Sequence, residues 1–395
     1  MGGLRITVVG IGADGHLPPA SAALVADAEV LLGGERHLAL VPDVPGQDRH
    51  AWPRPLTSLA TFLGEHEGRR VVALASGDPL VSGIGTTLLR LLGPDAVDVV
   101  PAVSSVALAR ARMGWSAEES TVVTLVGREL AALRRELADG RRLLVLSSDE
   151  STPAAVATLL DEAGFGTSTM HVLGNLGGAD ETVAVFPCPV PRLHVIALEV
   201  AGTGFASWAP GLPDDAFEHD GQLTKRDVRA SALSRLAPAP GRLLWDVGAG
   251  AGSVAIEWLR AHPLTDAIAV EADPERAARI SRNAGTLGVS RLEVVNDKAP
   301  DALTDLPRPD AVFVGGGATA PGLLDLCREA LAPGGRLVVH GVTLETEQLL
   351  IGAFHEHGGE LTRLAVEHVT PLGGRFTGWT PARAVTQWTW TKERA

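Results

Sequence analysis

Short apolar runs recur along the chain, and most of them end on a glycine or a polar residue. Such runs, bounded by turn residues, are typical of buried strands in an α/β protein. In the first half they predict strands at 5–9, 71–75, 97–100, 121–126, 142–146, 171–173 and 193–199. Helical periodicity predicts helices at 20–32 and 153–162, the second with Ser151 or Thr152 as its N-cap.

The second half alternates strand and helix more regularly. Strands are predicted at 242–247, 267–271, 292–296, 310–315 and 335–340, and helices at 253–262, 274–287 and 321–332. This order predicts a doubly wound α/β sheet. The strict apolar and polar alternation at 385–391 predicts a last strand in an antiparallel edge hairpin.

Between the halves lies a stretch rich in glycine and proline, at 202–213. Such composition is typical of an interdomain linker. We therefore expect one domain over 1–206 and a second over 211–395.

Composition narrows the function classes. The 395 residues are 45% hydrophobic and 21% charged, which is ordinary for a soluble globular protein. No basic stretch precedes an apolar core at the N-terminus, no apolar run reaches the ~18 residues of a membrane span, and Cys188 and Cys327 match no metal-ligand spacing. We expect a cytoplasmic protein without disulfides, bound metal or membrane contact.

The net charge of −13 argues against nucleic acid as a partner but allows an anionic small substrate in a local arginine pocket.

The most informative motif lies in the second half. A predicted strand enters the spacing Asp246-x-Gly248-x-Gly250-x-Gly252, and the next strand ends at Glu271. Glycines let a backbone approach a ligand closely, and a carboxylate at a strand end can accept hydrogen bonds from ribose hydroxyls. The spacing resembles the S-adenosylmethionine (SAM) site of Rossmann-like methyltransferases more than the dinucleotide fingerprint.

The first half has its own glycine-rich turn, in which Gly10, Gly12 and Gly15 match G-x-G-x-x-G. An NAD-dependent oxidoreductase is therefore an alternative. That fingerprint needs a helix to begin inside the motif, whereas Pro18 and Pro19 place the helix start near Ala20.

Five blocks of the first half, at 8–12, 28–33, 75–80, 101–105 and 173–177, resemble in order the signature blocks of the tetrapyrrole methylases. The resemblance covers about residues 4–200 and implies SAM in a cleft between two α/β lobes. It implies a cofactor site formed by Gly10, Gly12, Gly77, Asp78, Ser104 and Ser105. Asp78-Pro79 is also compatible with a plain turn, and Val103 stands where the family usually has glycine.

Six blocks of the second half, at 214–217, 221–229, 245–252, 271–273, 298–303 and 313–317, resemble the decarboxylating corrin methyltransferase domain. The resemblance implies that SAM is bound by Thr224, Asp246, Gly248, Ala249, Gly250, Ala251, Gly252, Glu271 and Ala299. Thr224 is also compatible with an N-cap. Lys225 and Arg229 are four residues apart on one helix face, and we interpret them as a clamp for substrate carboxylates or as a solvated charged face.

The two halves in this order resemble the bifunctional C5,15-methyltransferases of cobalamin biosynthesis. This implies methylation of C5 by the first half, methylation of C15 with loss of CO2 by the second, a tetrapyrrole substrate and a homo-oligomer formed through the second half. Two alternatives stay open. The first half could be a non-catalytic module, or the second half could act on RNA or protein, although the acidic charge and the lack of an Asn-Pro-Pro-Tyr-like motif disfavour the latter.

Overall fold

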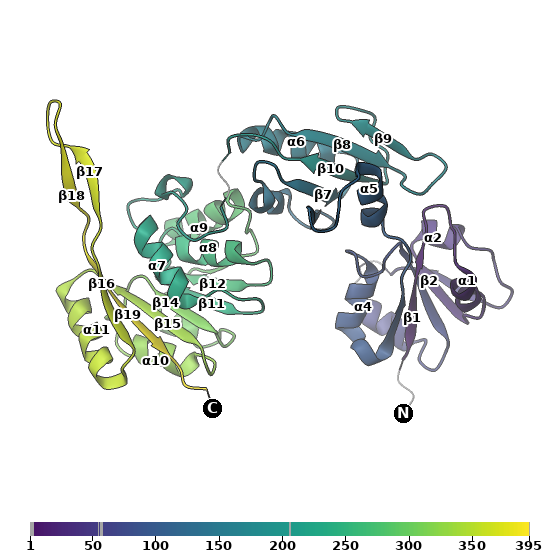
Figure 1. Cartoon of the computed structure of the whole chain (residues 1–395). Coiled ribbons are helices and arrows are strands. Elements are labelled where there is room, and N and C mark those ends of the chain that lie inside the picture. Colours follow the sequence, from purple (N-terminus) through teal and green to yellow (C-terminus); the bar gives the residue numbers. More distant parts are fainter. Residues whose placement is uncertain (1–3, 54, 56–57, 205–206, 395) are drawn as a thin grey trace. The chain divides into compact units, whose positions relative to one another are not determined.

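The computed structural model describes residues 4–53, 55, 58–204 and 207–394, which form two compact units. Unit 1 comprises Met1–Leu130 and Glu136–Phe205, and unit 2 comprises Ala131–Arg135 and Ala206–Ala395 (Figure 1). Phe205 and Ala206, on which the first predicted domain ends, lie outside the described residues. Within the described ranges no helix combines the length and apolarity needed to cross a bilayer.

The first lobe of unit 1 is a parallel sheet in the order β3-β2-β4-β1-β5. Its strands are β1 (Ile6–Ile11), β2 (Val30–Gly33), β3 (Asp48–Ala51), β4 (Val71–Ser76) and β5 (Val97–Val100), and its helices are α1 (Pro19–Ala26), α2 (Glu35–Ala39), α3 (Leu59–Gly64) and α4 (Ile84–Leu92). Neighbouring residues of β1 face opposite sides of the sheet. Val8 packs with Leu59 and Leu88, whereas Val9 packs with Val25. Both faces of the sheet are therefore covered, as parallel sheets require.

The second lobe is a mixed sheet in the order β6-β7-β10-β8-β9. Its strands are β6 (Ser120–Thr124), β7 (Arg142–Leu146), β8 (Thr169–Gly174), β9 (Thr182–Val185) and β10 (His194–Glu199), with helices α5 (Ser105–Met113) and α6 (Thr152–Glu162). Helix α5 packs Val106 and Ala109 against Leu144 and Leu173 of this sheet. The two-lobed α/β fold expected for the first half is thus confirmed.

The helix predicted over 20–32 is wrong in its second part. Helix α1 ends at Ala26, and Val30–Gly33 is strand β2, between β3 and β4. Every residue of β2 is buried, because the strand is covered on both faces. An apolar run buried on both sides has no period that separates strand from helix.

Unit 2 contains a seven-stranded sheet in the order β13-β12-β11-β14-β15-β19-β16. Its strands are β11 (Leu243–Val247), β12 (Asp266–Val270), β13 (Glu293–Val295), β14 (Ala311–Val314), β15 (Arg336–Gly341), β16 (Glu360–Leu364) and β19 (Val385–Thr391), and its helices are α7 (Arg226–Leu236), α8 (Ser253–Ala261), α9 (Pro274–Thr286), α10 (Leu323–Ala330) and α11 (Leu344–His357). The first five strands in this order are parallel, and β19 runs antiparallel to both of its neighbours. The Rossmann-like fold predicted for the second half is confirmed.

Alternate residues of the central strand β11 fill the two cores of unit 2. Leu244 packs in the core that contains Leu233 of α7 and Ile256 of α8. Trp245 packs in the opposite core, with Cys327 of α10 and Leu350 of α11. Helices on both faces thus fix the sheet and its strand ends.

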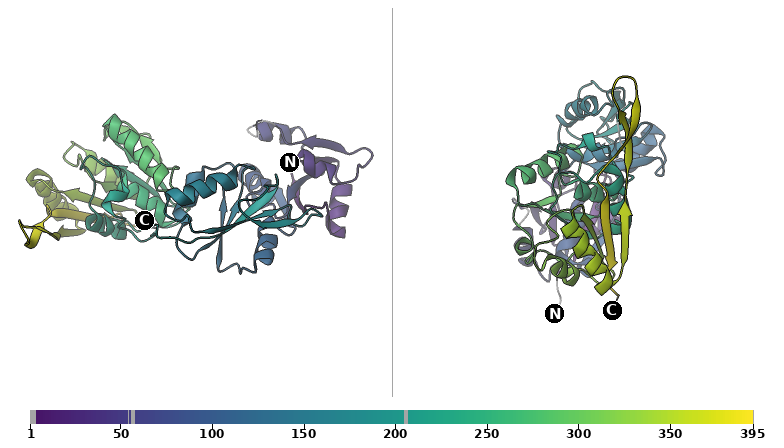
Figure 2. Two further views of the ribbon diagram at one scale, coloured as in Figure 1. Left: turned by 90° about the horizontal axis from the view of Figure 1, so that it is seen from above. Right: turned by 90° about the vertical axis from the view of Figure 1, so that its left-hand side faces the viewer.

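The antiparallel edge hairpin predicted to contain 385–391 is confirmed, because β19 pairs antiparallel with β16 at the end of the sheet. Strand β19 lies between β15 and β16, so that β16 is the edge. Between β16 and β19 in the sequence, the chain forms a separate hairpin of β17 (Glu367–Pro371) and β18 (Thr377–Pro381). This hairpin extends away from the sheet of its own unit (Figures 1 and 2).

Candidate functional site

In unit 2, the glycine-rich loop joins β11 to α8 at the carboxyl edge of the parallel strands. Gly248, Gly250 and Gly252 all have φ between +61° and +74°, a region that favours glycine. The Gly248 and Ala249 N–H groups both donate to Val270 O, at 3.0 and 3.2 Å. The loop is therefore tied to the end of β12, where ligands bind in open α/β sheets.

The same glycines are also needed for packing against other parts of the chain. A Cβ on Gly248 would lie 2.8 Å from Gly316 O, and one on Gly250 would lie 2.8 Å from Gln222 O. A Cβ on Gly252 would lie 2.7 Å from Cγ2 of Ile280. Close approach to a ligand, which the sequence suggested, is therefore not the only reason for glycine in this loop.

Glu271 follows β12 and is buried, with 7% of its surface exposed. Its Oε2 accepts a hydrogen bond from Gly250 N at 2.8 Å, and its Oε1 accepts one from Asp273 N at 3.0 Å. A carboxylate oxygen can accept more than one hydrogen bond, so both oxygens retain capacity for ligand hydroxyls.

Asp246 lies on β11, directly beneath the loop, and is 1% exposed. Its Oδ2 accepts from Ala255 N at 2.9 Å, whereas Oδ1 is buried without a partner in the described residues. Burial raises the pKa of this carboxyl to about 7, and the charge of Glu271 acts in the same direction. An unpartnered buried acceptor next to a glycine loop fits a site that a polar ligand completes.

Two further predicted residues, Thr224 and Ala299, lie on segments that contact the glycine-rich loop and the end of β12, respectively. Gln222, which Gly250 contacts, precedes Thr224 by two residues. Asn296 Nδ2 donates to Glu271 O at 2.8 Å and holds the loop that leads to Ala299. The N-cap interpretation of Thr224 is wrong, because α7 begins at Arg226 and Lys225 is its N-cap.

The clamp predicted at Lys225 and Arg229 needs correction at Arg229. This side chain is 0% exposed, and its guanidinium donates to Glu257 Oε1 at 2.6 Å, to Asp214, and to the carbonyl oxygens of Leu212 and Thr224. It also stacks on Phe217 at 4.8 Å. Arg229 is therefore a core residue that positions the segment before α7 and cannot reach a substrate. Lys225 is 55% exposed and lies 3.6 Å from Asp214.

In unit 1, the predicted residues meet at the carboxyl edge of β1 and β4. A Cβ on Gly10 would lie 2.0 Å from Gly77 O, and one on Gly77 (φ +53°) would lie 2.8 Å from Ser104 Cα. Ala102 N donates to Gly77 O at 3.1 Å. Three segments that are far apart in the sequence therefore contact one another at this edge.

The remaining predicted residues of this edge have local structural roles. Asp78 Oδ1 accepts from Leu80 N at 2.8 Å, so that the turn interpretation of Asp78 is correct. Ser104 Oγ accepts from Ala107 N at 3.1 Å and caps α5, which begins at Ser105. A Cβ on Gly12 would lie 2.7 Å from Oδ1 of Asp14.

The position of α1 bears on the dinucleotide alternative. The helix begins at Pro19, beyond Gly15, the last glycine of the G-x-G-x-x-G motif. As predicted, no helix N-terminus lies inside that motif, where a pyrophosphate would need it.

Sequence reasoning missed His340, which lies near the carboxyl end of β15. Its Nε2 lies 2.9 Å from Gln387 Oε1, and its ring packs edge-on against Phe313 at 4.8 Å. Burial lowers the pKa of His340 to about 4, so that the ring is neutral near neutral pH. The position of His340 depends on its contact with Gln387 of β19, which lies 47 residues further along the chain. No local pattern in the sequence indicates such a contact.

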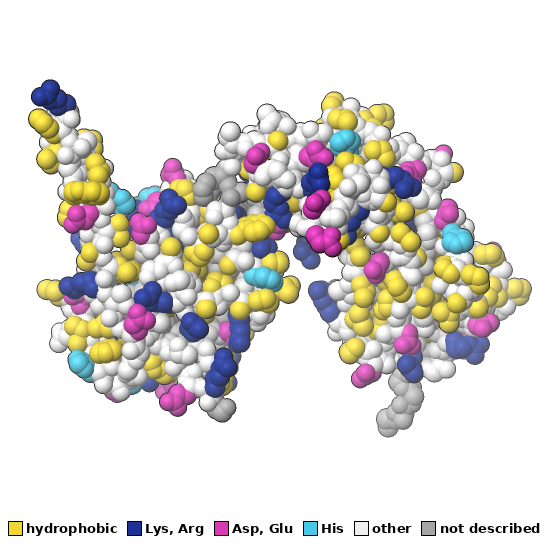
Figure 3. Space-filling model, viewed as in Figure 1, with side chains coloured by type: hydrophobic (Ala, Val, Ile, Leu, Met, Phe, Trp, Pro, Cys, Tyr) yellow, Lys and Arg dark blue, Asp and Glu magenta, His cyan; other side chains and the backbone are white. Residues whose placement is uncertain are grey.

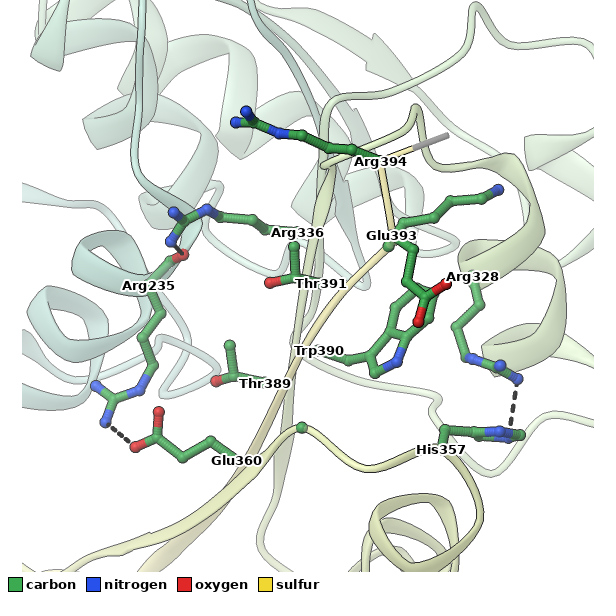
Figure 4. Close-up of a pocket in the computed structure, with 12 residues that line it drawn as sticks. Arg235, Arg328, Arg336, His357, Glu360, Thr389, Trp390, Thr391, Glu393 and Arg394 are labelled. Carbon is green, nitrogen blue, oxygen red and sulfur yellow. Dashed lines mark hydrogen bonds and ion pairs between the residues drawn. The ribbon is translucent and has the colours of Figure 1, made fainter.

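A cavity of about 920 Å³ lies at the opposite, amino end of the strands of unit 2. Its lining includes Arg235, Arg336, Glu360, Trp390 and Thr391 (Figure 4). Arg235 pairs with Glu360 at 2.9 Å and also accepts, through its carbonyl, a hydrogen bond from Arg336 at 2.9 Å. Because Arg336 begins β15, this cavity is not part of the glycine-loop site.

Comparisons with known proteins match both halves. Residues 5–190 match the tetrapyrrole (corrin/porphyrin) methylases, and residues 215–392 match the precorrin methyltransferase domain. A Sinorhizobium sp protein described as precorrin-6Y C(5,15)-methyltransferase [decarboxylating] is 45% identical over 98% of this chain and 96% of its own length. A Mycobacterium tuberculosis (strain CDC 1551 / Oshkosh) protein of the same description is 46% identical over 98% of this chain and 100% of its own length.

Among solved structures, the C-terminal domain of precorrin-6Y C5,15-methyltransferase from Rhodobacter capsulatus is 46% identical, with a TM-score of 0.45. The match covers 47% of this chain and 100% of the Rhodobacter capsulatus chain. The family resemblance predicted from the motifs is confirmed by the two nearly full-length relatives. This chain is therefore a methyltransferase that belongs to the decarboxylating precorrin-6Y C(5,15)-methyltransferase family.

Proposed function

We propose that this chain methylates C5 and C15 of precorrin-6B, with SAM as the methyl donor, and removes the ring C acetate as CO2 to give precorrin-8X. The observation that carries this proposal is that two relatives of this description align with nearly the whole chain. The two compact units support a division of labour, with C5 methylation in unit 1 and C15 methylation with decarboxylation in unit 2.

Each unit binds one SAM in this proposal. In unit 2 the ribose hydroxyls bind Glu271, and the rest of the cofactor lies along Thr224, Asp246, Gly248–Gly252 and Ala299. The buried, unpartnered Oδ1 of Asp246 and the tied loop Gly248–Gly252 support this assignment. In unit 1 the cofactor lies along Gly10, Gly12, Gly77, Asp78, Ser104 and Ser105, which share one sheet edge. SAM supplies an electrophilic sulfonium methyl group at each site.

The proposed reaction needs no strong general acid or base from the protein. Loss of CO2 leaves an electron pair that the conjugated tetrapyrrole accepts, and this makes a meso carbon nucleophilic toward the methyl group. The protein's contribution is to hold donor and acceptor in line and to exclude competing geometries. Lys225, which is exposed beside the Thr224 segment, is the remaining cation of the predicted clamp for a peripheral carboxylate.

We further propose a homo-oligomer formed through the hairpin β17–β18 of unit 2. Val369, Leu372, Phe376 and Trp379 are all more than half exposed on this hairpin. Figure 3 shows hydrophobic side chains along its length. Contiguous exposed apolar side chains mark interaction surfaces, and a second copy would cover them symmetrically.

The division of labour is tested by separating the halves. A fragment over 211–395 should fold, bind SAM, add one methyl group at C15 and release CO2, because its sheet takes no strand from unit 1. Ala131–Arg135 belongs to unit 2, and Arg135 Nε donates to Arg260 O at 3.0 Å, so we expect the fragment to be somewhat less stable than unit 2 in the whole chain. Circular dichroism establishes folding first. A folded fragment that methylates without decarboxylation would contradict the assignment.

A further inference from the structure

Three polar side chains of unit 1 converge at the carboxyl edge of its parallel sheet. Arg36 and His37 belong to α2, which follows β2, and Ser76 is the last residue of β4. Arg36 Nη2 lies 3.0 Å from Ser76 Oγ and 2.9 Å from His37 Nε2. His37 Nε2 lies 2.8 Å from Ser76 Oγ, so that the three groups form a closed triangle.

The protonation states in this triangle follow from chemistry. A guanidinium only donates, so the single lone pair of His37 Nε2 is shared between Arg36 and Ser76. The ring proton then resides on Nδ1, which is buried without a partner among the described residues. Burial and the charge of Arg36 lower the pKa of His37 to about 4, which keeps the ring neutral. Ser76 accepts from Arg36 and donates to His37. The triangle therefore carries one charge, that of Arg36.

Arg36 has no anionic partner among the residues that the structure describes. No carboxylate of a described residue lies within 4 Å of its guanidinium, and burial lowers its pKa. By contrast, Arg69 of the same lobe pairs with Asp48 at 2.6 Å, and Arg70 pairs with Glu29 at 3.6 Å. The Nε and Nη1 donors of Arg36 make no hydrogen bond to a described residue. A half-buried, unpaired cation that neutral groups hold in place is arranged to receive an anion.

The location indicates which anion this is. Ser76 pairs with Ile11 across β1 and β4, and Gly77 N donates to Ile11 O at 2.9 Å. The triangle therefore lies at the same sheet edge as Gly12 and the Gly77–Asp78 turn. The tetrapyrrole substrate carries acetate and propionate groups around its ring, and Arg binds carboxylates in a bidentate manner.

We propose that Arg36 binds a peripheral carboxylate of the tetrapyrrole in unit 1, and that His37 and Ser76 are positioning residues that orient its guanidinium. This inference rests on the proposed C5 methylation by unit 1. The same chemistry would recognise the carboxylate of the methionyl part of SAM, and the experiment below separates the two sources.

The test uses the whole chain, so that C15 methylation by unit 2 serves as an internal control. With SAM labelled with ¹³C in its methyl group, ¹³C NMR follows C5 and C15 methylation separately in Arg36→Met, Arg36→Lys and wild type. We expect the apparent KM for C5 methylation to rise about ten- to a hundredfold in Arg36→Met, the scale of hydrogen bonds to a charged group. Arg36→Lys should recover part of this loss, because a point charge replaces the planar fork. C15 methylation should not change.

Further variants test the positioning role. Ser76→Ala and His37→Phe should raise the same KM less than Arg36→Met does, and His37→Gln, which keeps a hydrogen-bonding group, should recover part of the His37→Phe loss. Arg70→Met, which removes an exposed paired arginine, is the matched control and should behave as wild type. S-adenosylhomocysteine affinity, measured by calorimetry, should stay within about threefold of wild type in all of them.

Three outcomes would overturn the proposal. An unchanged KM for C5 methylation in Arg36→Met removes Arg36 from substrate binding. A loss confined to S-adenosylhomocysteine affinity assigns the carboxylate to the cofactor instead. An equal loss at C5 and C15 means that the variant disturbs the whole chain. Absence of C5 methylation in wild type contradicts the proposed function itself and is thereby distinguished from failure of this inference.

Discussion

The backbone N–H of Gly250 donates to Oε2 of Glu271 across 2.8 Å, which joins the glycine-rich loop of unit 2 to the end of the neighbouring strand. The other oxygen of Glu271 holds Asp273 N, at the start of α9. One buried carboxylate thus fixes two loops at the edge where the cofactor is proposed to bind.

Replacement of Glu271 should weaken SAM binding to unit 2. We expect Glu271→Ala to cost about 1.5–3 kcal/mol, or roughly ten- to a hundredfold in Kd, the scale of hydrogen bonds to a charged group. Calorimetry on the 211–395 fragment measures this effect. Glu271→Gln, which keeps an oxygen for Gly250 N, should lose less, and Glu275→Ala, at an exposed acid of α9, is the matched control. An unchanged Kd in Glu271→Ala would remove this residue from the ribose role.

Arg229 and Lys225 should differ sharply in their effects on stability. Arg229→Met leaves the 3% exposed Glu257 without its ion partner, and we expect a loss of about 3–5 kcal/mol in the free energy of unfolding. Lys225→Ala should change that free energy by less than about 0.5 kcal/mol, because the ion pair of Lys225 is exposed. Urea denaturation checks both values, and equal losses would contradict the structural role of Arg229.

Lys225 should instead affect substrate binding. Lys225→Ala should raise the KM for the tetrapyrrole in the C15 reaction while SAM affinity stays within about threefold, because a side chain on the exposed end of α7 can bind a carboxylate without touching the cofactor. Steady-state kinetics of the 211–395 fragment measure the KM. Wild-type kinetics in this variant would end the clamp hypothesis.

The buried carboxyl of Asp246 should make the stability of unit 2 depend on pH. Burial raises its pKa from 3.8 to about 7, so the folded state holds this proton more tightly than the unfolded chain does. The stability from this group is therefore complete below the unfolded pKa and is lost as pH rises through about 7. Asp246→Asn cannot ionise, and we expect it to gain stability relative to wild type by up to about 4 kcal/mol as the pH rises from below 3.8 to above about 7.

Fluorescence of the buried Trp245, Trp258 and Trp388 follows the unfolding of unit 2 in this comparison. The difference between Asp246→Asn and wild type isolates this carboxyl from the other titrating groups. A difference that does not change with pH would show that Asp246 titrates normally.

The hairpin β17–β18 should hold the oligomer together. Phe376→Ser together with Trp379→Ser removes two large side chains that are 65% and 69% exposed, and the molar mass in solution should fall toward that of one chain. Light scattering after size exclusion measures this mass. Leu264→Ser, at a 63% exposed leucine outside the hairpin, should leave the mass unchanged. A double variant with the wild-type mass, or a monomeric wild type, would contradict this interface.

Local patterns predicted the strands that enter both proposed sites, β1, β4, β11 and β12, whereas β3, β9, β16, β17 and β18 were not predicted. Apolar runs that enter glycine-rich turns indicated the carboxyl edge of the parallel sheet in each unit. Glu271 was predicted as a site residue because it ends one of these apolar runs. Strand β2 was missed because its four buried residues have no period that excludes a helix.

Side-chain partnerships that span long stretches of sequence could not be predicted in this way. The spacing of Lys225 and Arg229 indicated a shared helix face but not which residue was buried, since the partner Glu257 lies 28 residues away. Similarly, Arg36 and His37 reach Ser76 across 40 and 39 residues, a contact that only the order of β2 and β4 creates.

In the proposed function, one chain transfers two methyl groups and removes one carboxyl group. Mass spectrometry of the product formed by the wild-type chain from precorrin-6B and SAM measures this directly. We predict a product that has gained two methyl groups and lost one CO2. A product with a single added methyl group, or with two methyl groups and the ring C acetate intact, would contradict the account.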